Sequence, residues 1–296
     1  MVYLTKPDTP YGSWPVLIQA ALDHAFTPGN MNPGILAIYA NLAAKDIMES
    51  FAVRPPDSRV RPSSGINCAA MPALVREGEV NERPGGNPLL FATGHFHHNL
   101  IYAALHSALP KDDFKVLDES EIALPEWWPE DTKRYTQEGH RDLRLEAKAE
   151  GWLAPNITPV ATFDVKTKHG LGMSRDTKKA MILENDTWGN LAQLATYTQP
   201  GEAGYILYSN REIPSEHAQT PQFKTCKVWA DDLDKVRDRV RWRVRQESRF
   251  YPELWMLYKN KKSPWKGYSP YAKYCNFLEA CKKKRIALGF EKAEEV

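Results

Sequence analysis

Two residues that alternate along a predicted strand carry the clearest chemical signal in this sequence. Asp164 and Lys166 lie in the segment FDVKT at residues 163–167, and positions i and i+2 of a β-strand project from the same face. A carboxylate there can bind Mg²⁺ or Mn²⁺, and a neighbouring ammonium group can orient an attacking water or neutralise the charge that develops on a phosphate. Many surface strands contain such a pair, so other residues must support the interpretation.

A second acidic residue precedes this pair along the chain. Asp142 follows Gly139 in the segment GHRDL, which reads as a turn glycine that leads into a strand with an early acid. One aspartate seldom holds a divalent ion alone, so a hydrolytic metal site needs a second carboxylate that converges on the first. We therefore expect Asp142 to lie near Asp164; the alternative is a simple turn residue.

Two further groups of polar residues flank these carboxylates. Gln193 and Tyr197 are four positions apart in a predicted helix and therefore share one helix face. Upstream, His98 lies four residues after Gly94 in the segment GHFHH, where the glycine is expected to open a helix. The alternatives are a core aromatic for Tyr197 and a capping or core histidine for His98.

These groups follow one another in a recognisable order along the chain. The sequence contains G-x-x-x-H, G-x-x-D, D-x-K-T and Q-x-x-x-Y, followed by the apolar strand GYILYS. This order resembles the RecB-like exonucleases of the PD-(D/E)XK nuclease superfamily, which include the nuclease domains of RecB and AddB, CRISPR-adaptation exonucleases and many phage exonucleases. The resemblance covers residues 63–281 and is most specific from D-x-K-T onward. The segment between Asp142 and Asp164 is long for the pattern, and Asp164 replaces the commoner Glu, although both carboxylates suit hard cations.

The resemblance implies a metal-dependent DNA exonuclease that hydrolyses phosphodiester bonds in DNA recombination, repair or other nucleic-acid processing. Its substrate would be linear DNA with a free end, and its cofactor Mg²⁺ or Mn²⁺. Carried over onto this sequence, the metal ligands would be His98, Asp142, Asp164 and the backbone carbonyl of Val165. His97 and His95 remain alternatives to His98.

The resemblance also implies roles for residues beside the metal. Lys166 would be the catalytic lysine, which helps to hold the hydroxide that attacks the phosphodiester. Gln193 and Tyr197 would contact DNA or the surroundings of the metal. Glu121 matches an acidic position that often precedes the G-x-x-D strand, and it is the least supported member of the catalytic set.

The four cysteines suggest an iron–sulfur cluster. In the cluster-bearing RecB-like exonucleases, one cysteine precedes the histidine motif and three lie near the C-terminus as C-x-x-C-x5-C. Cys68 matches the first position, and Cys275 and Cys281 match the final C-x5-C, but Ala272 occupies the remaining position. Cys226 would have to supply the fourth thiolate of a 4Fe–4S cluster. The alternative is an unpaired thiol at Cys226, with the other three cysteines as relics of a lost cluster.

The elements that must position these residues follow from the hydrophobic periodicity. It predicts helices over residues 14–26, 35–51, 89–109 and 188–197, strands over 115–124, 141–145, 159–166 and 204–209, and a long basic helix over 231–249. This order predicts an α/β fold with a mixed central β-sheet flanked by helices, and the resemblance implies a restriction-endonuclease-like core. We expect an N-terminal helical elaboration over residues 1–60, and a nuclease domain with basic C-terminal helices over residues 61–296.

Composition and charge restrict the class of protein. A chain with 42% hydrophobic and 26% charged residues is ordinary for a globular protein, and it contains no apolar run long enough for a membrane span. The first ten residues lack the features of a secretory signal, so we expect a cytoplasmic protein, or one in the host cytoplasm if phage-encoded, with reduced cysteines. From residue 235 onward, 17 Lys and Arg stand against 7 Asp and Glu, which fits a nucleic-acid backbone or a solvated basic helix face.

Two other classes of function compete with the nuclease. The first is a DNA-binding or scaffold protein that keeps the nuclease fold without cleavage, although Asp142, Asp164 and Lys166 are all present. The second is a zinc-binding regulatory protein that uses Cys and His ligands. The sequence lacks the paired C-x-x-C arrangement typical of such zinc sites.

Overall fold

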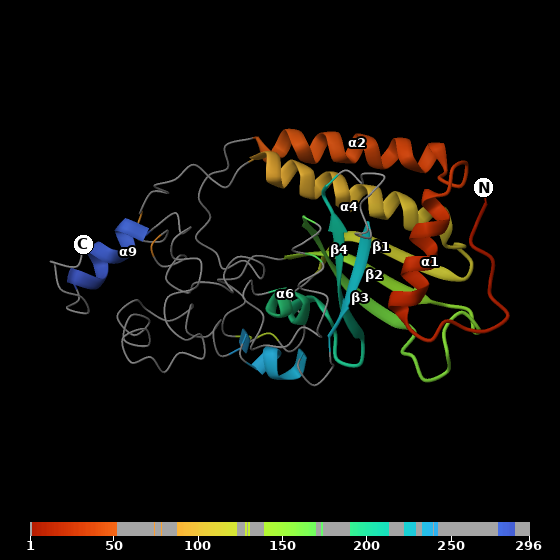
Figure 1. Cartoon of the computed structure of the whole chain (residues 1–296). Helices are drawn as coiled ribbons and strands as arrows, with labels where there is room; N and C mark the ends of the chain where they lie inside the picture. Colours follow the sequence, from red (N-terminus) through yellow and green to blue (C-terminus); the bar gives the residue numbers. More distant parts are fainter. Residues whose placement is uncertain are drawn as a thin grey trace.

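The computed structural model shows a five-stranded sheet with helices on both faces (Figure 1). It describes residues 2–51, 88–122, 139–169, 190–212, 222–228, 233–238, 240–241 and 278–287, together with Leu74, Gly78, Trp128, Glu130 and Met173. The named helices are α1 (Trp14–Phe26), α2 (Pro33–Ser50), α4 (Pro88–Ala108), α6 (Asn190–Tyr197) and α9 (Leu278–Ala287). The strands are β1 (Phe114–Ile122), β2 (Gly139–Ala147), β3 (Val160–Lys168), β4 (Ala203–Asn210) and β5 (Phe223–Lys227).

The strands lie in the order β1-β2-β3-β4-β5. The pairs β1–β2, β2–β3 and β4–β5 are antiparallel, whereas β3 and β4 are parallel. Parallel neighbours need a crossover connection, and α6 lies in the connection between β3 and β4. The predicted α/β class with a mixed sheet is therefore confirmed.

Each face of the sheet has its own hydrophobic core. On one face, Phe163 and Val165 of β3 and Leu207 of β4 pack with α1 and α4. On the other face, Ile206 and Tyr208 of β4 pack with α6 and with Leu233, Val236 and Val240. Because neighbouring residues of a strand point to opposite faces, β4 contributes side chains to both cores.

The two N-terminal helices take different places in this arrangement. The side chains of Trp14, Leu17 and Leu22 on α1 are fully buried in the same core as the sheet, and Trp14 Nε1 donates a hydrogen bond to the carbonyl of Thr158 at 2.8 Å. Helix α2 packs on the outer side of α4 (Figure 1), and it reaches the sheet through Tyr39, whose hydroxyl donates a hydrogen bond to Asp118 of β1. The helix α1 is thus part of the main core, and the predicted boundary at residue 60 falls outside the described residues.

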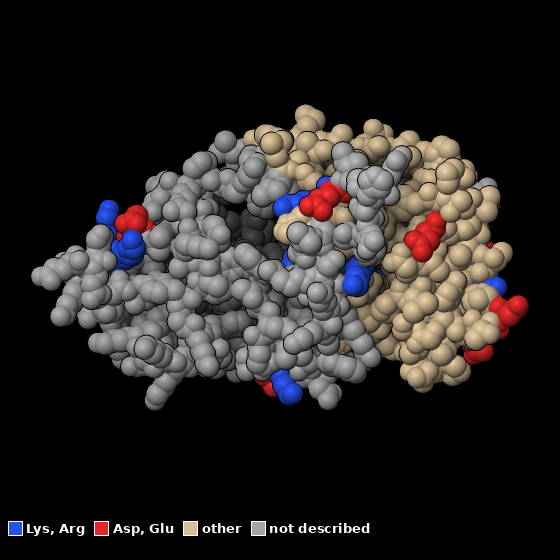
Figure 2. Space-filling view, in the orientation of Figure 1, with Lys and Arg blue, Asp and Glu red and all other residues tan. Residues whose placement is uncertain are grey.

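Helix α2 carries several exposed apolar side chains. Leu36, Ile38, Leu42 and Met48 are exposed by 38 to 75%, and Figure 2 shows most of this edge as uncharged surface. None of the described helices is both long enough and apolar enough to cross a membrane.

Most predicted elements appear within a few residues of their expected bounds, with three differences. Gly94 lies inside α4 and does not open it, because the helix begins at Pro88. Strand β5 was not predicted, and helix α9 was expected only as one of the basic C-terminal helices, without bounds. Of the basic helix expected over residues 231–249, the structure describes only residues 233–238 and 240–241, which are helical.

Candidate active site

The candidate site forms where two strands of the sheet part. The pairing of β2 with β3 runs from Glu146↔Val160 to Leu143↔Phe163. Beyond that point β2 stays paired with β1 as far as Gly139, and β3 stays paired with β4 as far as Lys168. Backbone groups on the facing edges of β2 and β3 therefore need other partners.

Val165 shows how those partners are supplied. Its N–H donates to Asp142 Oδ2 at 2.8 Å, and its carbonyl oxygen lies 3.0 Å from His98 Nε2. Two side chains thus satisfy the backbone of Val165 in place of a neighbouring strand. The predicted convergence of Asp142 on the D-x-K segment is present in the structure.

Lys166 joins the strand to helix α6. Its Nζ donates to Asp164 Oδ1 at 2.8 Å and to Gln193 Oε1 at 3.0 Å. The expectation that Asp164 and Lys166 project from one face is therefore met, and the register places them beside Ile206 and Tyr208 on the face that α6 covers. The lysine connects the D-x-K and Q-x-x-x-Y motifs directly.

Asp164 lies in an environment that opposes its charge. The residue is 2% exposed, and its burial raises the pKa of the carboxyl group to about 7, an effect that Lys166 reduces and the nearby Asp142 increases. Within the described part of the chain, Asp164 Oδ2 is buried and has no hydrogen-bond donor. A cation bound beside this oxygen would compensate the buried negative charge and would therefore be strongly stabilised.

The structure separates the three histidines of the GHFHH segment, which lies within α4. His98 faces Val165 as described, whereas His97 is buried with its Nδ1 2.7 Å from Ser209 Oγ on β4. Burial lowers the pKa of His97, and the neighbouring His98 lowers it further. His95 lies 4.0 Å from Asp46 on α2. Of the three, His98 is the histidine that reaches the carboxylate segment.

Tyr197 and Gly139 bring the other two motifs together. Tyr197 is 4% exposed, and a Cβ atom at Gly139 would lie 2.7 Å from its hydroxyl oxygen. Tyr197 therefore packs as a buried aromatic against Gly139, the first residue of β2. Its position is that of the core aromatic residue which the sequence analysis named as the alternative. Glu121 lies opposite His140 in the β1–β2 ladder, and its side chain is outside the described residues.

The donor atoms around Val165 are of the kinds that bind a hard divalent cation, although the described side chains are not yet close enough together to hold one. No group of three or more His, Cys, Asp or Glu in the described residues is close enough to hold a metal ion as it stands. However, His98 Nε2 and the carbonyl oxygen of Val165 lie 3.0 Å apart, so both would be available as ligands to one cation. With the unused oxygen of Asp164, the chemistry of the set fits Mg²⁺ or Mn²⁺.

The cysteines are only partly described. Cys68 and Cys275 lie outside the described residues. The backbone of Cys226 lies opposite Ile206 in the β4–β5 ladder, and Cys281 belongs to α9. Figure 1 shows α9 well apart from the sheet that contains β5, so the predicted cluster would have to bring these two segments together.

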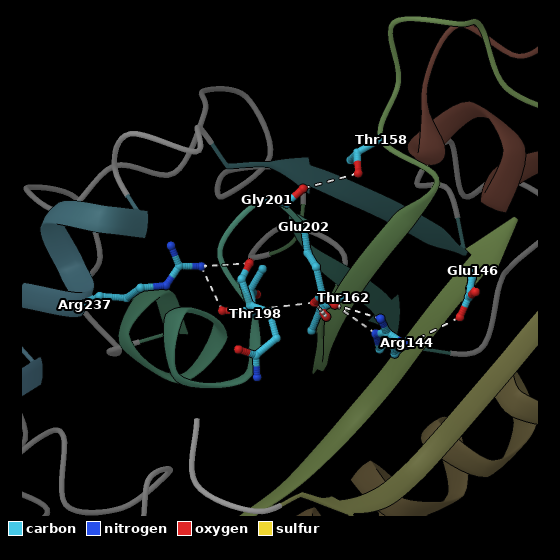
Figure 3. Close-up of polar contacts among 9 residues, drawn as sticks. Arg144, Glu146, Thr158, Thr162, Thr198, Gly201, Glu202 and Arg237 are labelled. Carbon is cyan, nitrogen blue, oxygen red and sulfur yellow. Dashed lines mark hydrogen bonds and ion pairs between the residues drawn. The ribbon is translucent and has the colours of Figure 1, made fainter. Parts of the chain in front are cut away.

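A partly buried ion pair supports the connection that carries α6, and no pattern in the sequence predicted it. Glu202 accepts hydrogen bonds from Arg144 Nε at 3.0 Å and Thr162 Oγ1 at 3.0 Å, and Arg144 Nη2 lies 2.9 Å from Glu202 Oε1 as an ion pair (Figure 3). The side chain of Glu202 is 9% exposed. The carboxylate follows α6 and holds the end of that connection against β2 and β3.

Arg237 secures the same connection from another side. Its Nη2 donates to the carbonyls of Thr198 at 2.8 Å and Gln199 at 3.4 Å, just beyond the last residue of α6 (Figure 3). A guanidinium group that caps the free carbonyls at the end of a helix also interacts well with its dipole. Together with Glu202, Arg237 fixes the helix that carries Gln193.

Comparison with known proteins does not assign the chain to a family. No protein-family model and no curated protein matches it. The crystal structure of SSO0001 aligns with 84% of this chain and 97% of its own, at 13% sequence identity and a TM-score of 0.36. This likeness is too low to carry any argument about fold or function.

Proposed function

We propose that this chain is a metal-dependent DNA exonuclease of the RecB-like branch of the PD-(D/E)XK nucleases. The observation that supports the proposal best is the position of Lys166, which contacts both Asp164 and Gln193. The contact unites two motifs 27 residues apart at the place where β2 and β3 part. Asp142 and His98 meet at the intervening Val165.

A divalent cation would be held by Asp142, Asp164, His98 and the carbonyl of Val165. Bound there, Mg²⁺ or Mn²⁺ would supply a Lewis acid and lower the pKa of a water ligand. Because a carbonyl oxygen can only accept, His98 Nε2 carries the proton in its contact with Val165. His98 would have to give up this proton to bind a metal.

The protein's own contribution to hydrolysis would come from Lys166 and Gln193. Gln193 Oε1 accepts one N–H of the Lys166 ammonium group and Asp164 another. These two contacts fix the position of Nζ, and its positive charge would stabilise an attacking water or a phosphate oxygen beside it. Such preorganised donors stabilise the charge that develops in the transition state.

Digestion of labelled DNA tests this proposal. Linear DNA labelled at one end should be degraded in the presence of Mn²⁺ and remain intact with EDTA, while covalently closed circles of the same sequence should resist. Rapid linearisation of the circles would indicate an endonuclease. Protein that binds DNA but cleaves neither form with Mn²⁺ or Mg²⁺ would instead be the DNA-binding protein that the sequence left open.

A further inference from the structure

Three lysines lie close to the buried side chain of Tyr208, on the face of the sheet that contains Asp164. The register pairs Lys166 of β3 with Tyr208 of β4, and Tyr208 with Lys224 of β5. Paired residues project from the same face of a sheet, so Lys166, Tyr208 and Lys224 form a row across three strands. Lys168, two residues after Lys166, projects from this face as well, and its Nζ lies 4.9 Å from the centre of the Tyr208 ring. Lys168 thus leans over the middle of the row.

The charge on this part of the face is positive beyond Asp164. Among the described residues of β3, β4 and β5 from Asp164 onward, the register places only three further charged residues here, namely Lys166, Lys168 and Lys224. The side chain of Lys166 is 24% exposed, and Lys168 and Lys224 are half-buried. Partly exposed charges of one sign, next to the carboxylates of the candidate metal site, attract a polyanion.

The lysines are spaced like contacts to a nucleic-acid backbone. A strand rises about 3.3 Å per residue, so the Cα atom of Lys168 lies about 7 Å from that of Lys166 along β3. Neighbouring strands are about 4.8 Å apart, so Lys224 lies about 10 Å from Lys166 across β4. Each strand of B-form DNA carries one phosphate per about 3.4 Å of helix axis, so these intervals correspond to about two and about three phosphates. A strand with a phosphate at Lys166 can therefore place others beside Lys168 and Lys224.

A structural role explains each of the two outer lysines only singly. Lys168 gains from the contact of its cation with the Tyr208 ring. The last strand in the sheet order is β5, and a lysine on an edge strand, such as Lys224, hinders pairing with another chain. Neither role requires the two lysines to share a face with Lys166, since an edge lysine is effective on either face. Their common face beside the candidate active site points to a ligand.

We propose that Lys168 and Lys224 form a lysine track, which binds the phosphate backbone of the DNA strand held at the candidate active site. From Lys166 the strand crosses β4 toward β5, and each lysine of the track contacts one phosphate as a point charge. The inference rests on the proposed nuclease function for its substrate, but it concerns binding and can be tested without cleavage.

Fluorescence anisotropy with EDTA present measures this binding. The probe is a labelled thymidine 12-mer, titrated at a series of NaCl concentrations. For a single strand, each phosphate contact contributes about 0.7 to the slope of log K against log [NaCl]. Lys168→Met and Lys224→Met keep an apolar stem without the charge, so each should reduce the slope by about 0.7 and weaken binding about fivefold at about 0.1 M NaCl. Lys168→Arg should keep the wild-type slope, because it keeps the charge.

The matched control is Lys111→Met. Lys111 is an exposed lysine just before β1, and the register places it at the opposite end of the sheet from Lys168. This variant should therefore keep the wild-type slope and affinity.

The outcomes separate the lysine track from the proposed hydrolysis. An unchanged slope in Lys168→Met or in Lys224→Met would overturn the track and leave hydrolysis of linear DNA untouched. An equal loss in Lys111→Met would also overturn it, because binding would then not be local to this face. A wild type that does not bind the 12-mer would overturn the track, and digestion of linear DNA would still decide on the nuclease. A slope that depends on both lysines, in a protein that never cleaves DNA, would support the track and overturn the nuclease.

Discussion

The hydroxyl of Tyr197 lies against the backbone of Gly139, so close that a Cβ atom there would be 2.7 Å from the oxygen and 2.8 Å from Cε1 of the ring. The side chain that would have to move belongs to a buried residue at the end of α6. The same helix carries Gln193, which contacts Lys166. The glycine at the start of β2 therefore allows α6 to approach the sheet.

Gly139→Ala should lower the free energy of unfolding by about 1 to 3 kcal/mol through overpacking. It should also reduce hydrolysis, because a displaced Tyr197 shifts α6. Urea denaturation and initial rates would measure both effects. In the double variant Gly139→Ala/Tyr197→Ala, the loss of unfolding free energy should be smaller than the sum of the two single losses. The new Cβ atom then no longer clashes with the tyrosine ring. Strict additivity would show that the two residues do not interact.

Removal of the Asp164 carboxylate should abolish hydrolysis. Asp164→Asn is expected to lower the rate at least about 100-fold, since a metal ligand is lost, while DNA binding is kept or improved as negative charge is removed. Asp112→Asn, which changes an exposed aspartate outside the site, should cleave at the wild-type rate. Lys166→Met should lose most activity and retain Mn²⁺ binding by calorimetry. A wild-type rate in Asp164→Asn would show that the site is misassigned.

The pH dependence of stability should reflect Asp164. Burial raises the pKa of this carboxyl group from 3.8 to about 7, so the folded protein retains a proton that the unfolded chain releases. The stability from this group is present below about pH 4 and is lost as the pH rises through about 7. The melting temperature of metal-free wild type should therefore fall relative to Asp164→Asn between about pH 4 and about pH 8. Parallel pH curves for the two proteins would contradict the raised pKa.

The rate of hydrolysis should have the opposite pH dependence. A metal binds the ionised carboxylate, so activity should rise with an apparent pKa near or below the value of about 7. Because protons and metal compete for Asp164, the midpoint should move to lower pH as the Mn²⁺ concentration increases. A midpoint that is independent of Mn²⁺ would indicate that another group controls the rate.

The Arg144–Glu202 pair should contribute strongly to stability. Glu202→Gln leaves Arg144 and Thr162 with a weaker acceptor in a mostly buried position, and we expect a loss of about 2 to 4 kcal/mol in urea denaturation. The matched control is Glu49→Gln, which breaks the pair Lys45–Glu49 between side chains that are 72% and 52% exposed. It should cost less than about 0.5 kcal/mol. If the two variants lost similar amounts of unfolding free energy, the Arg144–Glu202 pair would stabilise the fold no more than an exposed pair does.

The proposed 4Fe–4S cluster can be tested by iron content. Protein purified without oxygen should be brown and contain about four irons per chain, and Cys226→Ser should lose the colour as fully as Cys275→Ser. A colour that survives Cys226→Ser would remove Cys226 from the ligand set. Colourless, iron-free protein would refute the cluster and leave the carboxylate site unaffected.

Sequence patterns were sufficient to predict most helices and strands of this protein and the residues that share one face of each. The predicted strand over residues 159–166 was enough to place Asp164 and Lys166 on one face, because the side-chain period of a strand is a property of the backbone. Helical spacing likewise placed Gln193 and Tyr197 together, and the order of elements indicated the mixed sheet. Strand β5 escaped prediction because it is only five residues long. The bounds of α9 were not predicted because its low apolar content leaves little periodic signal.

How these parts meet depends on the tertiary structure. The spacing of the histidines favoured His98 but could not exclude its neighbours; the packing of α4 brings His98 to Val165 and sends His97 to Ser209. The raised pKa of Asp164 depends on burial that no local pattern reveals. Glu202 and Arg144 are 58 residues apart, and their pairing arises from the crossover between β3 and β4. Contacts of this kind depend on which elements pack together, because burial and charge pairing are properties of the whole fold and not of a segment.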